Sequence, residues 1–230
     1  CSTVPIDGLH SFAEVYFLLM SGAGVGVDVS KRYIEKIPKV KKLNGEKSKI
    51  VFEDSKEGWS VGTMAVCTAM WEGYDVEWDL SKLRPQGARL KTFGGRSSGP
   101  GPLDETLHFI KHMVEAHRDR KLSSINAFDI ITKIANSVVV GGVRRSSIIT
   151  LSDLYDSGMR NAKQGQFWIT NGHRAMSNNS AIYDVKPNSI DFMKEWLALA
   201  ESGTGERGIF NGYSINDLIP KRRRKRQDWT

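Results

Sequence analysis

Residues 141–150, GGVRRSSIIT, decide how this 230-residue chain is best interpreted. They follow an apolar run at 138–140 and end in apolar residues at 148–149, which predicts a loop between two buried elements. The two glycines free the backbone beside two arginines and two serines, so several donors can surround one anion. We predict a phosphate- or nucleotide-binding loop. A tight turn with solvated arginines is the alternative interpretation.

A second stretch of the same kind supports the nucleotide interpretation. Residues 94–101, GGRSSGPG, again combine paired glycines, an arginine and two serines. Two such loops in one chain suggest two walls of one site.

Composition and charge exclude several classes of protein. A 40% apolar content suits a globular core, and no apolar run is long enough to cross a bilayer, so we expect a cytoplasmic protein without a membrane partner. Cys1 and Cys67 cannot form a disulfide framework. Of the net charge of +7, six positive charges lie in KRRRKR at 221–226. We interpret this block as a linker, because a nucleic-acid binder would spread its basic residues over a face.

Predicted strands and helices alternate along the chain, which favours an α/β fold with parallel strands. Ser11 and Glu14 have the spacing of a capping box at the start of a helix, and Cys67 is expected to be a buried apolar residue. We expect His108 and His112 to be surface residues rather than metal ligands. The expected strands are 1–7, 25–29, 50–54, 74–79 and 165–170. Residues 176–183 should form an amide-rich turn that enters a strand, and residues 203–211 should end as a strand. The expected helices are 11–20, 59–71, 103–117, 124–137 and 190–201. The last helix should place Phe192, Trp196, Leu197 and Leu199 on the core.

Four sets of motifs occur in one order along the chain. They are CSTVPID with SGAGVGVDV (1–7, 21–29), GARLKTFGGRSSGP (87–100), VVVGGVRRSSIITLSD (138–153), and NNSAIY with ESGTGERGIFN (178–183, 201–211). Together they resemble the catalytic barrel of ribonucleotide reductases, above all the adenosylcobalamin-dependent ribonucleoside-triphosphate reductases. The resemblance implies the first half of a ten-stranded α/β barrel. Residues 1–216 would form this partial barrel domain, and 217–230 a basic linker to a strand that carries the radical cysteine.

The resemblance also implies roles for individual residues. Cys1 matches a cysteine of the redox pair that reduces the substrate ribose, and its partner would lie downstream, since Cys67 does not match it. The residues implied near the substrate are Ser2, Thr3, Gly87, Ala88 and Arg89. Those implied to bind a deoxynucleoside triphosphate effector are Asp7, Arg96, Ser97, Ser98, Gly141, Gly142, Arg144, Arg145 and Ser146.

The implied activity is reduction of ribonucleoside triphosphates with adenosylcobalamin as cofactor and a thioredoxin-like protein or other dithiol as reductant. The strand with the radical cysteine is not in this sequence, so we expect the chain alone to be inactive without the remainder of the reductase. That observation and the cysteine at position 1 predict a gene interrupted by an intein or intron, or a partial reading frame.

Three alternatives remain open at this point. The chain could belong to a reductase with a separate radical-generating subunit, because the barrel motifs are shared. It could be a non-catalytic relic that binds deoxynucleotides. Binding of nucleic acid through KRRRKR ranks last.

Overall fold

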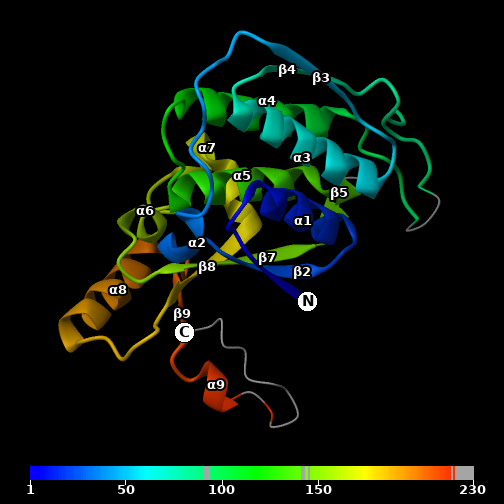
Figure 1. The fold of residues 1–230 in the computed structure, drawn as a ribbon. Helices are drawn as coiled ribbons and strands as arrows, with labels where there is room; N and C mark the ends of the chain where they lie inside the picture. Colours follow the sequence, from blue (N-terminus) through cyan, green and yellow to red (C-terminus); the bar gives the residue numbers. More distant parts are fainter. Residues whose placement is uncertain (91–93, 141–142, 145, 219, 221–230) are drawn as a thin grey trace.

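A five-stranded sheet, in which every neighbouring pair of strands is parallel, carries most of the long helices on one face (Figure 1). The computed structural model describes residues 1–90, 94–140, 143–144, 146–218 and 220. The strand order is β1-β2-β7-β8-β9. The strands are β1 Ser2–Pro5, β2 Gly24–Asp28, β7 Ser147–Asp153, β8 Ser177–Ile182 and β9 Gly208–Phe210. The expected α/β class with parallel strands is confirmed.

The register assigns each strand residue to one of two faces. Ser2 pairs with Val25, and Val25 pairs with Ile148, so this row shares a face. Val25 and Ile148 are buried in the main core, which identifies the face covered by helices. Because successive side chains alternate, Gly24 and its partner Ser147 belong to the opposite face.

Helices and a small second sheet are stacked on the covered face (Figure 1). Helices α1 and α5 lie nearest the large sheet, α3 and α4 lie beyond them, and the parallel pair β3–β4 is outermost. One continuous core joins the large sheet to all of these layers. The bounds are α1 Leu9–Met20, α2 Lys31–Ile34, β3 Lys47–Val51, α3 Lys56–Glu72, β4 Asp75–Asp79, α4 Gly101–Ala116 and α5 Ser124–Ser137.

The remaining elements complete the part of the chain that the structure describes. They are β5 Val139–Val140, β6 Val143–Arg144, α6 Ser157–Arg160, α7 Phe167–Thr170, the 3-10 helix η1 Gly172–Met176, α8 Ser189–Ser202 and α9 Ile215–Leu218. Within the described ranges, we find no helix with the length and apolarity that a bilayer crossing requires.

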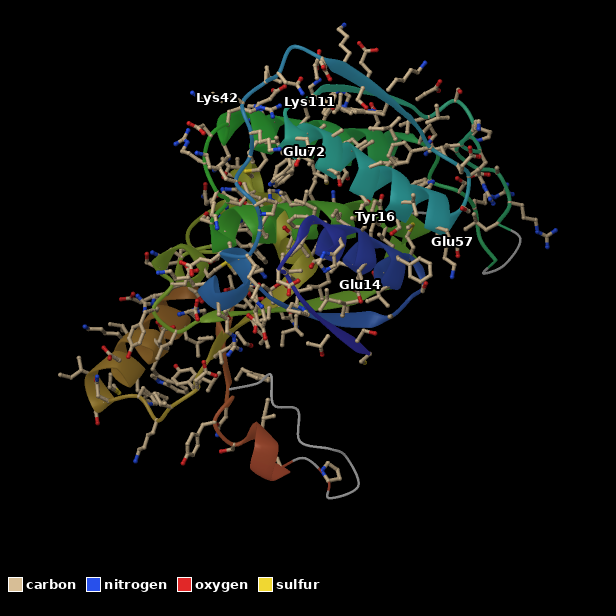
Figure 2. The ribbon with its side chains drawn as sticks, in the orientation of Figure 1. Glu14, Tyr16, Lys42, Glu57, Glu72 and Lys111 are labelled. Atoms are coloured by element: carbon tan, nitrogen blue, oxygen red, sulfur yellow. The ribbon has the colours of Figure 1, made fainter. Side chains whose placement is uncertain are left out.

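Tyr16 fastens α1 to α5 inside the core (Figure 2). Its ring is fully buried, and its hydroxyl oxygen lies 2.8 Å from Ser137 Oγ. Burial raises the pKa of Tyr16, although the Ser137 hydrogen bond lowers it in part. The phenol therefore stays neutral and acts as a structural link.

Three local predictions from sequence were wrong. Helix α1 begins at Leu9 with Gly8 at its N-cap, and the Ser11 hydroxyl donates to Asp7 Oδ1 instead of forming a capping box. Residues 167–170 form the helix α7 rather than a strand. The amide-rich segment at 178–179 is already inside β8, because both residues pair with β7.

Helix α8 also turns a different face to the protein than expected. Phe192 and Leu199 are half-buried, but Trp196 and Leu197 are 51% and 57% exposed. The one buried residue of α8 is Glu195, whose carboxylate accepts hydrogen bonds from Arg160 and Arg207. Ionic contacts therefore decide how α8 docks.

Asp129 forms a buried ionic link between α5 and η1. Arg174 donates from Nε and Nη2 to the two carboxylate oxygens at 2.7 and 2.8 Å, and His173 Nε2 lies 3.1 Å from Oδ1. Burial alone would raise the pKa of Asp129, but Arg174 and His173 outweigh burial, so the pKa is lowered.

We expect Asp129→Asn to lower the free energy of unfolding at pH 7 by roughly 2 kcal/mol, since a buried charge-assisted link is lost. A lowered folded-state pKa stabilises the fold above the unfolded-state value of about 3.9 and loses this effect as pH falls further. The difference between wild type and variant should therefore shrink below about pH 4. Urea unfolding at pH 7 and pH 3 measures it, with Glu14→Gln on the exposed side of α1 as control (Figure 2). A difference independent of pH would contradict this assignment.

Candidate nucleotide site on an open sheet face

Cys1 lies at the amino-terminal edge of the large sheet. It precedes β1 directly, and its residue is exposed. A Cβ atom at Gly24 would lie 3.5 Å from Cys1 Sγ and 3.2 Å from Ser147 Oγ. The two side chains therefore approach one another over a glycine on the strand between them.

The amino-terminal half of this sheet face is open and lined by small residues. Thr3, Ser147 and Asn178 are exposed, and Ile149 is 40% exposed. Glycines at 24 and 26 on β2 keep the backbone accessible between them. A flat ligand could therefore approach the backbone near the Cys1 thiol.

Two of the predicted substrate residues have different places on the sheet. Thr3 pairs with Gly26 and belongs to the open face with Cys1. Ser2 pairs with Val25, so its side chain belongs to the covered face and is half-buried. Of the two, Thr3 is the better placed to meet a ligand.

The remaining predicted substrate residues and part of the predicted effector residues form one hairpin. Ser97 N donates to Ala88 O at 2.7 Å, and Gly87 N donates to Ser97 O at 2.9 Å. Arg89 and Arg96 form an antiparallel bridge, and Arg96 Nη1 donates to Gly87 O at 2.9 Å. Ser98 follows on the same arm. We call residues 87–98 the arginine hairpin; residues 91–93 within it lie outside the described residues.

The second predicted loop is also flanked by antiparallel strands. Val139 pairs with Arg144 and Val140 with Val143. Gly141, Gly142 and Arg145 lie outside the described residues, as does the side chain of Arg144. Ser146 follows, and its Oγ is buried without a hydrogen-bond partner among the described residues. A buried hydroxyl without a partner costs free energy unless a ligand or water completes it.

Asp7 is placed apart from this second loop. It follows the carboxyl end of β1, whereas Ser146 precedes the amino end of β7, and the two strands run parallel through β2. At about 3.3 Å per residue, the two positions are roughly 20 Å apart along the sheet. Asp7 instead lies 3.5 Å from His10 Nε2 and 3.8 Å from Lys36 Nζ. The structure does not bring Asp7 together with Ser146.

The sequence contained signals for two residues near Cys1 that we had not singled out. Glycine alternates with valine at 24–27, which is the pattern of a strand with one bare face. Ser147 precedes the buried Ile148, so alternation places it on the opposite face from the core. Cys67 is buried as expected, and burial raises its pKa to about 12, so its thiol is inert.

Comparisons with known proteins indicate the family of the chain. Residues 34–114 match the family described as "B12-dependent ribonucleotide reductase, insertion domain". The chain is 30% identical over 232 residues to the adenosylcobalamin-dependent ribonucleoside-triphosphate reductase of Lacticaseibacillus paracasei. This alignment covers 84% of this chain and 30% of that protein. It is 29% identical over 240 residues to the reductase of the same name from Lactobacillus gasseri, and that alignment covers 87% of this chain and 32% of the relative. The chain thus spans about a third of the length of these curated relatives.

A solved structure establishes the fold. The crystal structure of a B12-dependent (class II) ribonucleotide reductase matches 92% of this chain and 36% of that chain, with a TM-score of 0.77 and 24% identity. The five parallel strands therefore correspond to part of the α/β barrel of that enzyme, as the resemblance implied. By its sequence relatives and its fold, the chain belongs to the family of adenosylcobalamin-dependent, or class II, ribonucleotide reductases.

Proposed function

We propose that the protein to which this chain belongs reduces ribonucleoside triphosphates to 2′-deoxyribonucleotides by thiyl-radical chemistry, for DNA synthesis. The observation that carries the proposal is the exposed Cys1 thiol at the edge of an open, glycine-lined sheet face. The ribose would meet this thiol on the open face, with Thr3 beside it. Ser2 and residues 87–89 would complete the substrate surroundings through the backbone.

In the proposed reaction Cys1 acts with a second cysteine outside this chain. The two sulfurs supply two electrons to the ribose, the 2′-hydroxyl leaves as water, and the sulfurs become a disulfide. An external dithiol, such as a thioredoxin-like protein, then reduces that disulfide by exchange. Replacing Cys1 is the direct test, and its expected result opens the Discussion.

The cofactor proposal rests on the relatives, whose names state adenosylcobalamin dependence. When bound, this cofactor would supply homolytic cleavage of its carbon–cobalt bond. In the part of the chain that the structure describes, no three His, Cys, Asp or Glu side chains group as metal ligands. Cobalt carried by its own corrin ring needs no such cluster, so we assign no residue of this chain to the cofactor. Absorbance of bound cobalamin by the complete protein separates this proposal from a reductase with a separate radical-generating subunit.

We further propose that the arginine hairpin and the segment 141–146 bind a deoxynucleoside triphosphate effector. Arg96 and Ser146 support this proposal most directly. Arg96 is exposed and braced on Gly87 O, so its guanidinium is held in place with donors to spare. Ser146 Oγ is buried and lacks a partner among the described residues. Ser97, Ser98, Arg144 and Arg145 are further candidates, and Asp7 would require a separate contact at the other end of the sheet.

We expect Arg96→Met to weaken binding of deoxynucleoside triphosphates by about tenfold, the loss typical of one charge-assisted hydrogen bond. Titration calorimetry of the complete protein with each deoxynucleotide measures this. Arg120→Met is the matched control, because Arg120 is also exposed and also donates to one backbone carbonyl, that of Ala116. Equal affinities of the two variants would refute the effector role of the hairpin.

A further inference from the structure

Three strands bring Cys1, Gly24 and Ser147 into one row on the open face. Gly24 pairs directly with Ser147, and Cys1 precedes the pair Ser2–Val25 by one residue. The missing side chain of Gly24 leaves a gap whose centre lies within 3.5 Å of both Cys1 Sγ and Ser147 Oγ. Both residues are exposed, so the gap opens on the face where we place the substrate.

We propose that Ser147 is a positioning residue that donates a hydrogen bond to the Cys1 sulfur across the gap left by Gly24. A hydroxyl is both donor and acceptor, so it can accept a hydrogen bond from the thiol and donate one to the thiolate. A donated hydrogen bond favours the charged form of an acid, and here it raises the thiolate fraction of Cys1 at neutral pH. Gly24 is required because any side chain there would separate the sulfur from the hydroxyl.

The role of this contact in turnover rests on the proposed function. After ribose reduction Cys1 is part of a disulfide. When the external dithiol attacks the partner sulfur, a new bond forms to that sulfur and the old S–S bond breaks. Its electron pair stays on Cys1, which leaves as a thiolate, while the dithiol sulfur is oxidised. Ser147 stabilises the leaving thiolate, and a better leaving group speeds exchange.

Alkylation of Cys1 in the complete, reduced protein tests the contact without nucleotide, cofactor or turnover. Iodoacetamide reacts with the thiolate, so the rate of modification of the Cys1 peptide, followed by mass spectrometry from pH 5 to 10, reports the thiolate fraction. Cys67 is an internal control, because a buried thiol with a pKa raised to about 12 is modified only if the chain unfolds.

We expect Ser147→Ala to reduce the alkylation rate at pH 7 by about three- to tenfold. The pH at which the rate reaches half of its maximum should rise by about one unit, and the maximum rate at high pH should be unchanged. Ser147→Thr, which keeps the hydroxyl, should restore the wild-type profile. Gly24→Ala should reduce the rate, because its methyl group fills the gap. Ser180→Ala is the control for loss of a hydroxyl elsewhere on the same face.

An unchanged profile for Ser147→Ala with Cys67 protected would overturn the proposal. Should Ser147→Ala expose Cys67, Ser147→Gly also lacks the hydroxyl and takes its place. Because alkylation requires no reductase activity, its outcome is independent of the turnover test of Cys1. A failed contact and a failed function are therefore distinguishable.

Discussion

Replacing Cys1 with serine in the full-length reductase is expected to abolish multiple turnover and to lower steady-state kcat by about 1000-fold or more, a loss typical of removing a covalently reacting group. A serine oxygen occupies a similar volume and keeps a hydrogen-bond donor, but it cannot form the disulfide that stores the oxidising equivalents. The exposed position of Cys1 makes the substitution well tolerated by the fold.

Deoxynucleotide formed per enzyme, with excess dithiol, is the measurement. Cys67→Ala is the matched control, because Cys67 is fully buried in α3 and should leave turnover within about twofold, as expected for a small core residue remote from the chemistry. Sustained deoxynucleotide formation by the Cys1→Ser variant would refute the redox role of Cys1.

Replacing Arg207 with methionine should produce the largest loss of stability, about 3–5 kcal/mol in the free energy of unfolding. The Arg207 side chain is 2% exposed, and it donates to Glu195 Oε2 at 3.1 Å and to Ser152 Oγ at 2.9 Å. It also donates to the carbonyl oxygens of Asp153, at 2.8 Å, and Leu154. One guanidinium thus joins the start of β9 to α8 and to the end of β7. Without it, several buried acceptors lose their donor.

Urea unfolding of the Arg207→Met chain tests this value. Lys47→Met is the control, since the Lys47–Glu77 pair is exposed on the small sheet and should contribute little. The double variant Arg207→Met, Glu195→Gln should lose less than the sum of the single variants, because it removes the uncompensated buried charge. A loss below about 1 kcal/mol for Arg207→Met would contradict the assigned link.

Periodicity predicted the large helices well. Residues 124–137 were expected as a helix and form α5 with those bounds, because isoleucine and phenylalanine recur on one face beside a capping serine. The short strand at 74–79 was also confirmed as β4, within one residue. Both segments bury one apolar face, and the periodic spacing of apolar residues in the sequence predicts such a face.

Other features depend on partners distant in the sequence. Helix α8 buries Glu195 rather than its aromatic residues, because Arg160 and Arg207 lie beside it only after folding. The segment 167–170 has the β-prone composition of a strand yet forms a helical turn. The separation of Asp7 from Ser146 follows from strand direction, which no local pattern contains.

The strand order of the large sheet leaves one edge of β2 unpaired for part of the time during synthesis on the ribosome. Strand β2 ends at Asp28, and its neighbour β7 begins at Ser147, so well over a hundred residues are made between two adjacent strands. At a synthesis rate of about 5–20 residues per second, roughly 6 to 24 seconds pass between completion of β2 and the start of β7. During this time one edge of β2 offers unpaired amide and carbonyl groups to other nascent chains. Gly24 and Gly26, which keep the face of the folded sheet open, also lower the strand propensity of β2, and this limits pairing of its unpaired edge with other chains.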